Sequence, residues 1–162
     1  MFGFFNKGKK SQKFEMFAPV SGKCISIDKV PDEAFASKML GDGVAIVPSE
    51  GVLVSPFNCT VSQVFDTKHA YVLKSDFDLD VLVHIGIDTV KLNGEGFENK
   101  VSASQKLSKG EVVSNFDLDF LSKNGCPLHT PIIFTNMDKF KIEFNHGDMI
   151  RGQTVLCSIS KI

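Results

Sequence analysis

Short runs of β-type residues recur along the chain from Phe14 onward, with Pro, Gly and Asn residues between them. The runs cover residues 14–18, 23–27, 44–48, 51–55, 60–65, 70–74, 81–86, 112–116, 132–136 and 154–159. Short strands that repeat roughly every ten residues, separated by turn residues, are typical of antiparallel sandwiches and barrels. We therefore predict an all-β protein that folds as an antiparallel β-sandwich or barrel.

Two stretches depart from this pattern and favour short helices. Residues 31–41 begin with Pro31 and two acidic residues and end at Gly41, and residues 118–123 are followed by an Asn-Gly pair. Pro and acidic residues are common at helix starts, and Gly and Asn are common at helix ends. Both segments are too short to form core helices, so we expect two surface helices that lie across sheet edges.

Two pairs of segments resemble one another and indicate internal pseudo-symmetry. Residues 18–22 and 55–59 each carry a Pro and lead into an alternating strand. Residues 107–113 and 149–155 each place a Gly turn with a flanking base before a strand that contains Val. Repeats of this kind support a β architecture, and they carry no information about chemistry.

The length of the chain favours one domain with a short N-terminal extension. A chain of 162 residues can bury a single hydrophobic core, and we assign residues 14–162 to one domain. Residues 1–13 contain three Phe, four Lys and no acidic residue. We expect a flexible tail there. The alternative is a weak interfacial anchor, with Phe in the lipid headgroup region and Lys facing anionic lipid.

Charge and cysteine usage exclude several classes of protein. Eighteen basic residues oppose 19 acidic ones, for a net charge of −1, so nucleic acid is not an expected partner. The four Cys residues are far apart and form no C-x-x-C pair, which is typical of reduced thiols in the cytosol. No apolar run approaches the ~20 residues that span a bilayer. We expect a cytoplasmic protein, peripheral at the inner face of the cell membrane if the tail binds lipid.

One histidine interrupts the most apolar of the predicted strands. His84 lies in the sequence VLVHIGID, which begins at Val81. Gly86 allows backbone or a ligand to approach the imidazole closely, and Asp88 supplies an anion that can bias the ring or a cationic partner. A lone histidine in such a strand is more often a hydrogen-bonded core residue than a functional one. A functional interpretation therefore needs a second residue.

That second residue is His69, which falls at the neighbouring predicted strand. Thr67 precedes it by two residues, so we expect Thr67 and His69 to share one face of that strand. The Thr hydroxyl can then hydrogen-bond one ring nitrogen and fix the tautomer of His69. The remaining histidines, His129 and His146, lie beside Pro and Gly in predicted turns, and we expect ordinary surface groups there.

Two imidazoles supported by a Thr and an Asp suit two kinds of chemistry. A zinc site would need a third and a fourth ligand. Phosphoryl transfer to an imidazole needs a neutral ring held by its other nitrogen and a donor to the phosphoryl oxygens, which the second His can supply. The chain has no phosphate-binding loop, no nucleophile elbow and no H-E-x-x-H motif. Both kinds of chemistry remain open on the residues alone.

Several motifs resemble the glucose-class enzyme IIA of the bacterial phosphoenolpyruvate-dependent sugar phosphotransferase system. They are the Thr67–His69 pair, VLVHIGIDTV from Val81, LNGEGF from Leu92, and the shorter matches AP-x-SG, VPD, GDGVAI and NMD. The resemblance extends from about Phe14 to the C-terminus. It implies an antiparallel β-sandwich, in agreement with the strand pattern.

The resemblance also implies an enzyme, a phosphotransferase component that carries a phosphoryl group during sugar uptake. On this view His84 accepts the group from the histidine phosphocarrier protein and passes it to a cysteine of the sugar-specific IIB domain or IIBC permease. His69 stabilises the phosphoryl group, and Thr67 orients His69. No cofactor is required, and we expect a monomer.

Both partners would dock on an apolar surface around the site. Asp32 and Asp88 would face a basic residue of the phosphocarrier protein. The other members implied by the resemblance are Ala34, Phe35, Met39, Leu40, Phe65, Leu82, Gly86 and Val90. The alternative is a non-enzymatic regulatory module that acts on transporters or kinases. In that case His69 and His84 contact partner proteins, directly or through a zinc ion shared with the partner.

Overall fold

The computed structural model describes residues 12–162. The predicted N-terminal tail therefore lies outside the described residues up to residue 11. Lys13, which the sequence analysis assigned to the tail, is the first residue of a strand. Within the described range, no helix is long and apolar enough to cross a membrane.

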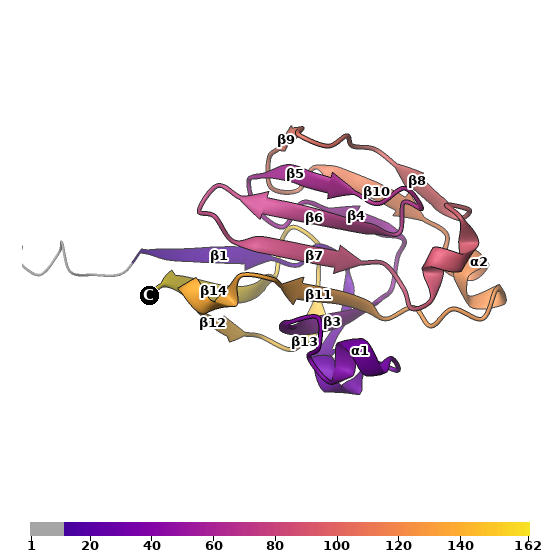
Figure 1. The fold of residues 1–162 in the computed structure, drawn as a ribbon, viewed down its shortest axis with the longest axis horizontal. Helices are drawn as coiled ribbons and strands as arrows, with labels where there is room; N and C mark the ends of the chain where they lie inside the picture. Colours follow the sequence, from indigo (N-terminus) through magenta and orange to yellow (C-terminus); the bar gives the residue numbers. More distant parts are fainter. Residues whose placement is uncertain (1–11) are drawn as a thin grey trace, which may run out of the picture.

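Most regular structure in the described chain is β-strand (Figure 1). The strands are β1 (Lys13–Phe17), β2 (Gly22–Ser26), β3 (Asp42–Pro48), β4 (Val52–Val54), β5 (Cys59–Val64), β6 (Ala70–Ser75), β7 (Asp80–His84), β8 (Phe97–Asn99), β9 (Lys106–Leu107), β10 (Val112–Phe116), β11 (Thr130–Phe134), β12 (Phe140–Phe144), β13 (Gly147–Met149) and β14 (Val155–Lys161). The α-helices are α1 (Glu33–Ala36) and α2 (Leu118–Lys123), and the 3₁₀ turns are η2 (Ile27–Lys29), η3 (Thr89–Leu92) and η4 (Met137–Lys139). All strand pairs are antiparallel. The prediction of an all-β antiparallel fold with short surface helices is confirmed.

The strands form three sheets whose order is symmetric about the β7–β11 pair. The largest sheet has the order β13-β2-β3-β11-β7-β6-β5-β9, and the two smaller sheets have the orders β1-β14-β12 and β4-β10-β8. On either side of the β7–β11 pair, β6 corresponds to β3, β5 to β2 and β9 to β13. The two smaller sheets correspond in the same way. The chain is thus built from two similar halves related by a pseudo-twofold axis.

Matched hydrogen bonds confirm this internal symmetry. Gly110 donates its N–H to the carbonyl of Ser55, and Gly152 donates to the carbonyl of Ala18, both at 2.8 Å. Segments 18–22 and 55–59, which resemble each other in sequence, therefore occupy equivalent places in the two halves, and so do segments 107–113 and 149–155.

The two faces of β7 contribute to different apolar clusters. Val81, Val83 and Ile85 are fully buried in the main core. Leu82 and His84 alternate with them on the opposite face, because successive side chains of a strand point to opposite sides of the sheet. Leu82 packs there against a second, smaller cluster. His84 is therefore placed by strand alternation outside the main core.

Four strands were not predicted from the sequence, and one predicted helix was too long. The strands β8, β9 and β13 have only two or three residues each, too few for an alternating pattern to be recognised. The sequence of β12, FKIEF, does alternate, but no strand was predicted there. The segment 31–41 contains only the four-residue helix α1, because the chain turns at residues 37–40 and Lys38 has a left-handed φ of 64°.

Candidate active site

The pairing of β6 with β7 brings the two predicted histidines together. His84 is the last residue of β7 and lies opposite Ala70, the first residue of β6. Because His69 directly precedes Ala70, it lies beside His84, and the N–H of Ile85 donates to the His69 carbonyl at 2.7 Å. The two imidazole centroids are 4.7 Å apart, and the ring planes are at 82°. The predicted constellation of two imidazoles is present.

A hydrogen bond to backbone defines the tautomer of His84. Its Nδ1 lies 2.7 Å from the carbonyl oxygen of Gly86. A carbonyl can only accept a hydrogen bond, so Nδ1 carries the proton and Nε2 keeps a free lone pair. Gly86 reaches this position with φ at +73°, and a Cβ there would lie 2.6 Å from Thr89 Cγ2. Glycine is therefore required for both backbone angle and space.

Thr89, which was not among the predicted site residues, stabilises this turn. Its side chain is fully buried, and its hydroxyl donates to the carbonyl of Ile85 at 2.6 Å. The bond links η3 to the chain directly after His84, next to the glycine that binds the ring. A Thr hydroxyl that bonds a carbonyl four residues earlier is a common local motif, and this was the only signal in the sequence.

The predicted contact between Thr67 and His69 is present, although not on a strand. Thr67 lies in the turn between β5 and β6, where Lys68 has a left-handed φ of 58°. A strand cannot include such a residue, so the predicted strand position of Thr67 is wrong. The turn nevertheless brings the hydroxyl of Thr67 to 2.6 Å from Nδ1 of His69. The expected hydrogen bond therefore forms from a different backbone arrangement.

Burial keeps both imidazoles neutral at physiological pH. Burial, together with the smaller effect of the neighbouring His84 as a potential like charge, lowers the pKa of His69 from 6.5 to about 4. Burial is also the main cause that lowers the pKa of His84 below 6.5, against the opposing effects of the Gly86 carbonyl and of Asp32 and Asp88. A neutral imidazole with a free Nε2 is the nucleophilic form of histidine.

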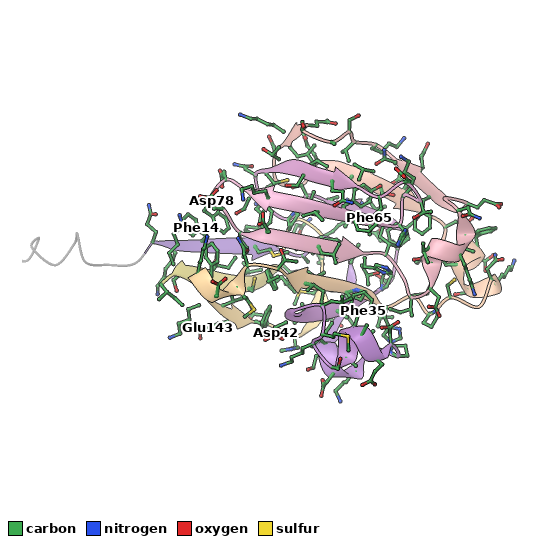
Figure 2. All side chains as sticks on the ribbon, in the orientation of Figure 1. Phe14, Phe35, Asp42, Phe65, Asp78 and Glu143 are labelled. Atoms are coloured by element: carbon green, nitrogen blue, oxygen red, sulfur yellow. The ribbon has the colours of Figure 1, made fainter. Side chains whose placement is uncertain are left out.

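Two aromatic rings flank the histidine pair. The ring of Phe35 lies 5.1 Å from that of His84 at 61°, and the ring of Phe65 lies 5.6 Å from that of His69 at 76°. Figure 2 shows the two Phe residues on either side of the end of β7, whereas Phe14 and Asp78 lie at its opposite end. The site thus has an apolar wall next to each imidazole.

The residues implied for partner docking differ widely in exposure. Met39, Val90 and Leu40 are 75%, 54% and 46% exposed. Asp88 is also exposed. Asp32, Ala34, Phe65 and Leu82 are half-buried, whereas Phe35 and Gly86 are buried. Three of the implied docking residues are therefore both apolar and exposed, and two implied members present almost no surface.

The two kinds of chemistry that the histidine pair suits require different groups from the chain. Within residues 12–162, no group of three or more His, Cys, Asp and Glu side chains could hold a metal ion. His69 and His84 would supply two ligands of a tetrahedral zinc site, and a partner would have to complete it. For phosphoryl transfer, the described residues place a neutral imidazole with a free Nε2 next to a second imidazole.

The predictions for the other histidines are confirmed only for His146, which is exposed. His129 is half-buried, and its Nδ1 is fully buried with no hydrogen-bond partner among residues 12–162. Burial lowers its pKa. The prediction of an ordinary surface group is therefore wrong for His129, because the start of β11 lies inside the large sheet and not in an exposed turn.

Comparisons with known proteins find relatives that cover most of the chain. Residues 14–140 match the model of the phosphoenolpyruvate-dependent sugar phosphotransferase system, EIIA 1. A glucose-specific EIIA component of Buchnera aphidicola (subspecies Baizongia pistaciae) is 43% identical over 161 residues, which cover 98% of this chain and 96% of that protein. A glucose-specific EIICBA component of Staphylococcus saprophyticus is 45% identical over 130 residues, 80% of this chain and 19% of that protein.

A solved structure shows the same fold. The chain resembles glucose permease IIA from Mycoplasma capricolum with a TM-score of 0.86 and 33% sequence identity, over 91% of this chain and 96% of that one. The β fold and these relatives define a phosphotransferase component that carries a phosphoryl group in sugar uptake. The chain belongs to the EIIA family of the phosphoenolpyruvate-dependent sugar phosphotransferase system. None of these matches favours the regulatory alternative.

Proposed function

We propose that Nε2 of His84 is the atom that carries the phosphoryl group. The observation that supports this is the 2.7 Å hydrogen bond from Nδ1 to the Gly86 carbonyl, which leaves Nε2 as the nucleophilic nitrogen. In the first half-reaction, the Nε2 lone pair attacks the phosphorus of the phosphohistidine on the phosphocarrier protein. A P–Nε2 bond forms as the carrier's P–N bond breaks, and the carrier imidazole leaves.

The same hydrogen bond prepares the second half-reaction. Phosphorylation of Nε2 while Nδ1 remains protonated makes the ring an imidazolium, and the Gly86 carbonyl stabilises its positive charge. A cysteine thiolate of the IIB domain then attacks the phosphorus. The P–S bond forms, the P–Nε2 bond breaks, and its electron pair returns to Nε2. His84 leaves as a neutral imidazole, ready for the next cycle.

His69 is proposed to stabilise the phosphoryl group. When the Thr67 hydroxyl donates to Nδ1 over their 2.6 Å contact, the proton of neutral His69 lies on Nε2. That N–H is then available to the phosphoryl oxygens on His84, whose ring centroid is 4.7 Å away. A preorganised donor of this kind typically contributes about 3 kcal/mol to the step that depends on it.

The proposed partners are the histidine phosphocarrier protein and a IIB domain or IIBC permease that imports glucose. The glucose-specific names of the relatives support the sugar, and the fused EIICBA relative supports a IIB and IIC partner. The exposed apolar residues Met39, Leu40 and Val90 would contact both partners, with Asp32 and Asp88 facing a basic residue of the carrier. We propose that the chain acts without a cofactor.

Separate half-reactions test the assignment. Wild-type protein incubated with phosphoenolpyruvate, enzyme I and the phosphocarrier protein should gain the mass of one acid-labile phosphate. His84→Gln should gain none, because an amide nitrogen is not a nucleophile. His69→Gln should accept phosphate but transfer it to IIB far more slowly. Full labelling of His84→Gln would overturn the proposal for His84, and wild-type onward transfer by His69→Gln would overturn the proposal for His69.

A further inference from the structure

Phe35 differs from its neighbours in the segment that the resemblance assigns to docking. Met39 and Leu40, a few residues further on, are 75% and 46% exposed, whereas Phe35 is only 5% exposed. Its side chain belongs to the smaller apolar cluster on the outer face of the large sheet. The other buried members of this cluster are Ile27, Val30, Ala45, Ile87 and Ile133. Phe35 is thus an interior residue that a docked partner can barely touch.

The ring of Phe35 contacts the proposed nucleophile. It packs against the imidazole of His84 with the centroids 5.1 Å apart and the planes at 61°, an edge-type aromatic geometry. His69 approaches the same imidazole at 82°. Apart from these two rings, the imidazole is held by the Gly86 carbonyl at Nδ1. A single hydrogen bond at Nδ1 does not fix the tilt of the imidazole about the N–H···O direction. The contacts with the two aromatic rings restrict this tilt.

The chain around Phe35 is itself well defined. Asp32 caps α1, and its Oδ1 accepts a hydrogen bond from the backbone N–H of Phe35 at 3.2 Å. Ile133 and Ala45, from β11 and β3, belong to the same cluster and are fully buried. The helix cap and the sheet therefore fix Phe35 from two sides. Because Phe35 is itself fixed, its ring can restrict the orientation of the His84 imidazole.

From this arrangement we infer that Phe35 is a positioning residue for His84 and that it makes no docking surface of its own. Its ring keeps the imidazole in the orientation that directs Nε2 toward the site, and it excludes water from one side of the imidazole. The kinetic consequence rests on the proposed function of His84. The effect on the imidazole itself does not.

The test compares Phe35→Leu with Met39→Ala, which shortens the most exposed apolar side chain of the same segment. Imidazole ¹H–¹⁵N spectra recorded across the pH range give the tautomer and the pKa of His84. Kinetics of phosphoryl acceptance at varied phosphocarrier concentration give kcat and KM. Phe35→Met fills the site without an aromatic ring and serves as a second variant if Phe35→Leu does not fold, with thermal melts as the check.

The two variants should fail in different ways. Phe35→Leu should raise the pKa of His84 toward 6.5, because the ring is more hydrated. It should also lower kcat roughly tenfold, since a nucleophile held less firmly spends less time in the reacting geometry. KM should stay near the wild-type value. Met39→Ala should raise KM and leave both kcat and the His84 titration unchanged.

The opposite pattern would overturn the inference. If Phe35→Leu and Phe35→Met keep the wild-type kcat and His84 titration and raise KM, Phe35 is a docking residue. The spectra decide whether Phe35 acts on His84 even if wild-type protein accepts no phosphate. That last outcome would instead refute the proposed function.

Discussion

Protonation of His69 should destabilise the fold between pH 6.5 and pH 4. His69 is 4% exposed, and its pKa is lowered from 6.5 to about 4 by burial and by the neighbouring His84. The unfolded chain therefore binds a proton at a higher pH than the folded chain does. Between these two pKa values the unfolded state holds more protons, so the free energy of unfolding falls as the pH falls. Above pH 6.5 this contribution to stability is fully present.

The size of the effect follows from the difference between the two pKa values. About 2.5 pKa units, at about 1.36 kcal/mol for each, correspond to about 3 kcal/mol. This is the upper value, since water that reaches the charged ring in the folded state reduces the cost. It is also a large fraction of the 5–15 kcal/mol that typically separates folded from unfolded proteins.

Urea denaturation at several pH values between 7 and 4.5 measures this contribution. His69→Gln removes the titrating ring but keeps an amide that can bond the Thr67 hydroxyl. Its free energy of unfolding should depend less on pH than that of the wild type, by about 2–3 kcal/mol over the window. His146→Gln is the matched control, because it removes an exposed histidine, and its curve should run parallel to the wild type. Parallel curves for wild type and His69→Gln would refute the reasoning.

Three further predictions concern the site and the core. Gly86→Ala should lose about 1–3 kcal/mol of stability in denaturation experiments, because φ is +73° and a Cβ would clash with Thr89. The variant should also accept phosphate slowly. Phosphate acceptance at the wild-type rate would contradict the proposed role of the Gly86 turn. Thr67→Val should slow phosphoryl transfer to IIB, and Thr67→Ser should keep the wild-type rate, since the hydroxyl of Thr67 contacts His69. If Thr67→Val and the wild type transfer labelled phosphate at equal rates, the hydrogen bond has no role in this step. Burial raises the pKa values of Cys24 and Cys157 to about 12. Both thiols should therefore resist alkylation by iodoacetamide at pH 8 in the folded protein and should react in urea. Peptide mass spectrometry measures the alkylation of each.

Local sequence patterns were enough to predict the fold class and to single out His84, His69 and Thr67 as candidate site residues. Alternating residues and the turn residues between them indicated ten of the strands, and helix α2 spans the predicted residues 118–123. His84 at the end of an apolar strand, the glycine that binds its ring, and the Thr67–His69 contact all depend on residues close together in the chain. Contacts between residues a few positions apart depend mainly on the local backbone conformation, so they can be predicted from the sequence.

Only the tertiary structure decided which strands pair and what lies against the site. The register of β6 and β7 places His69 beside His84, and a one-residue slip would turn one of them to the other face. The burial of Phe35 against His84 depends on how α1 packs on the outer face of β3 and β11. An alternating strand needs an apolar layer on one side and accepts many partners on its edges. Its pattern therefore predicts which face is buried, and the packing of distant segments determines what covers that face.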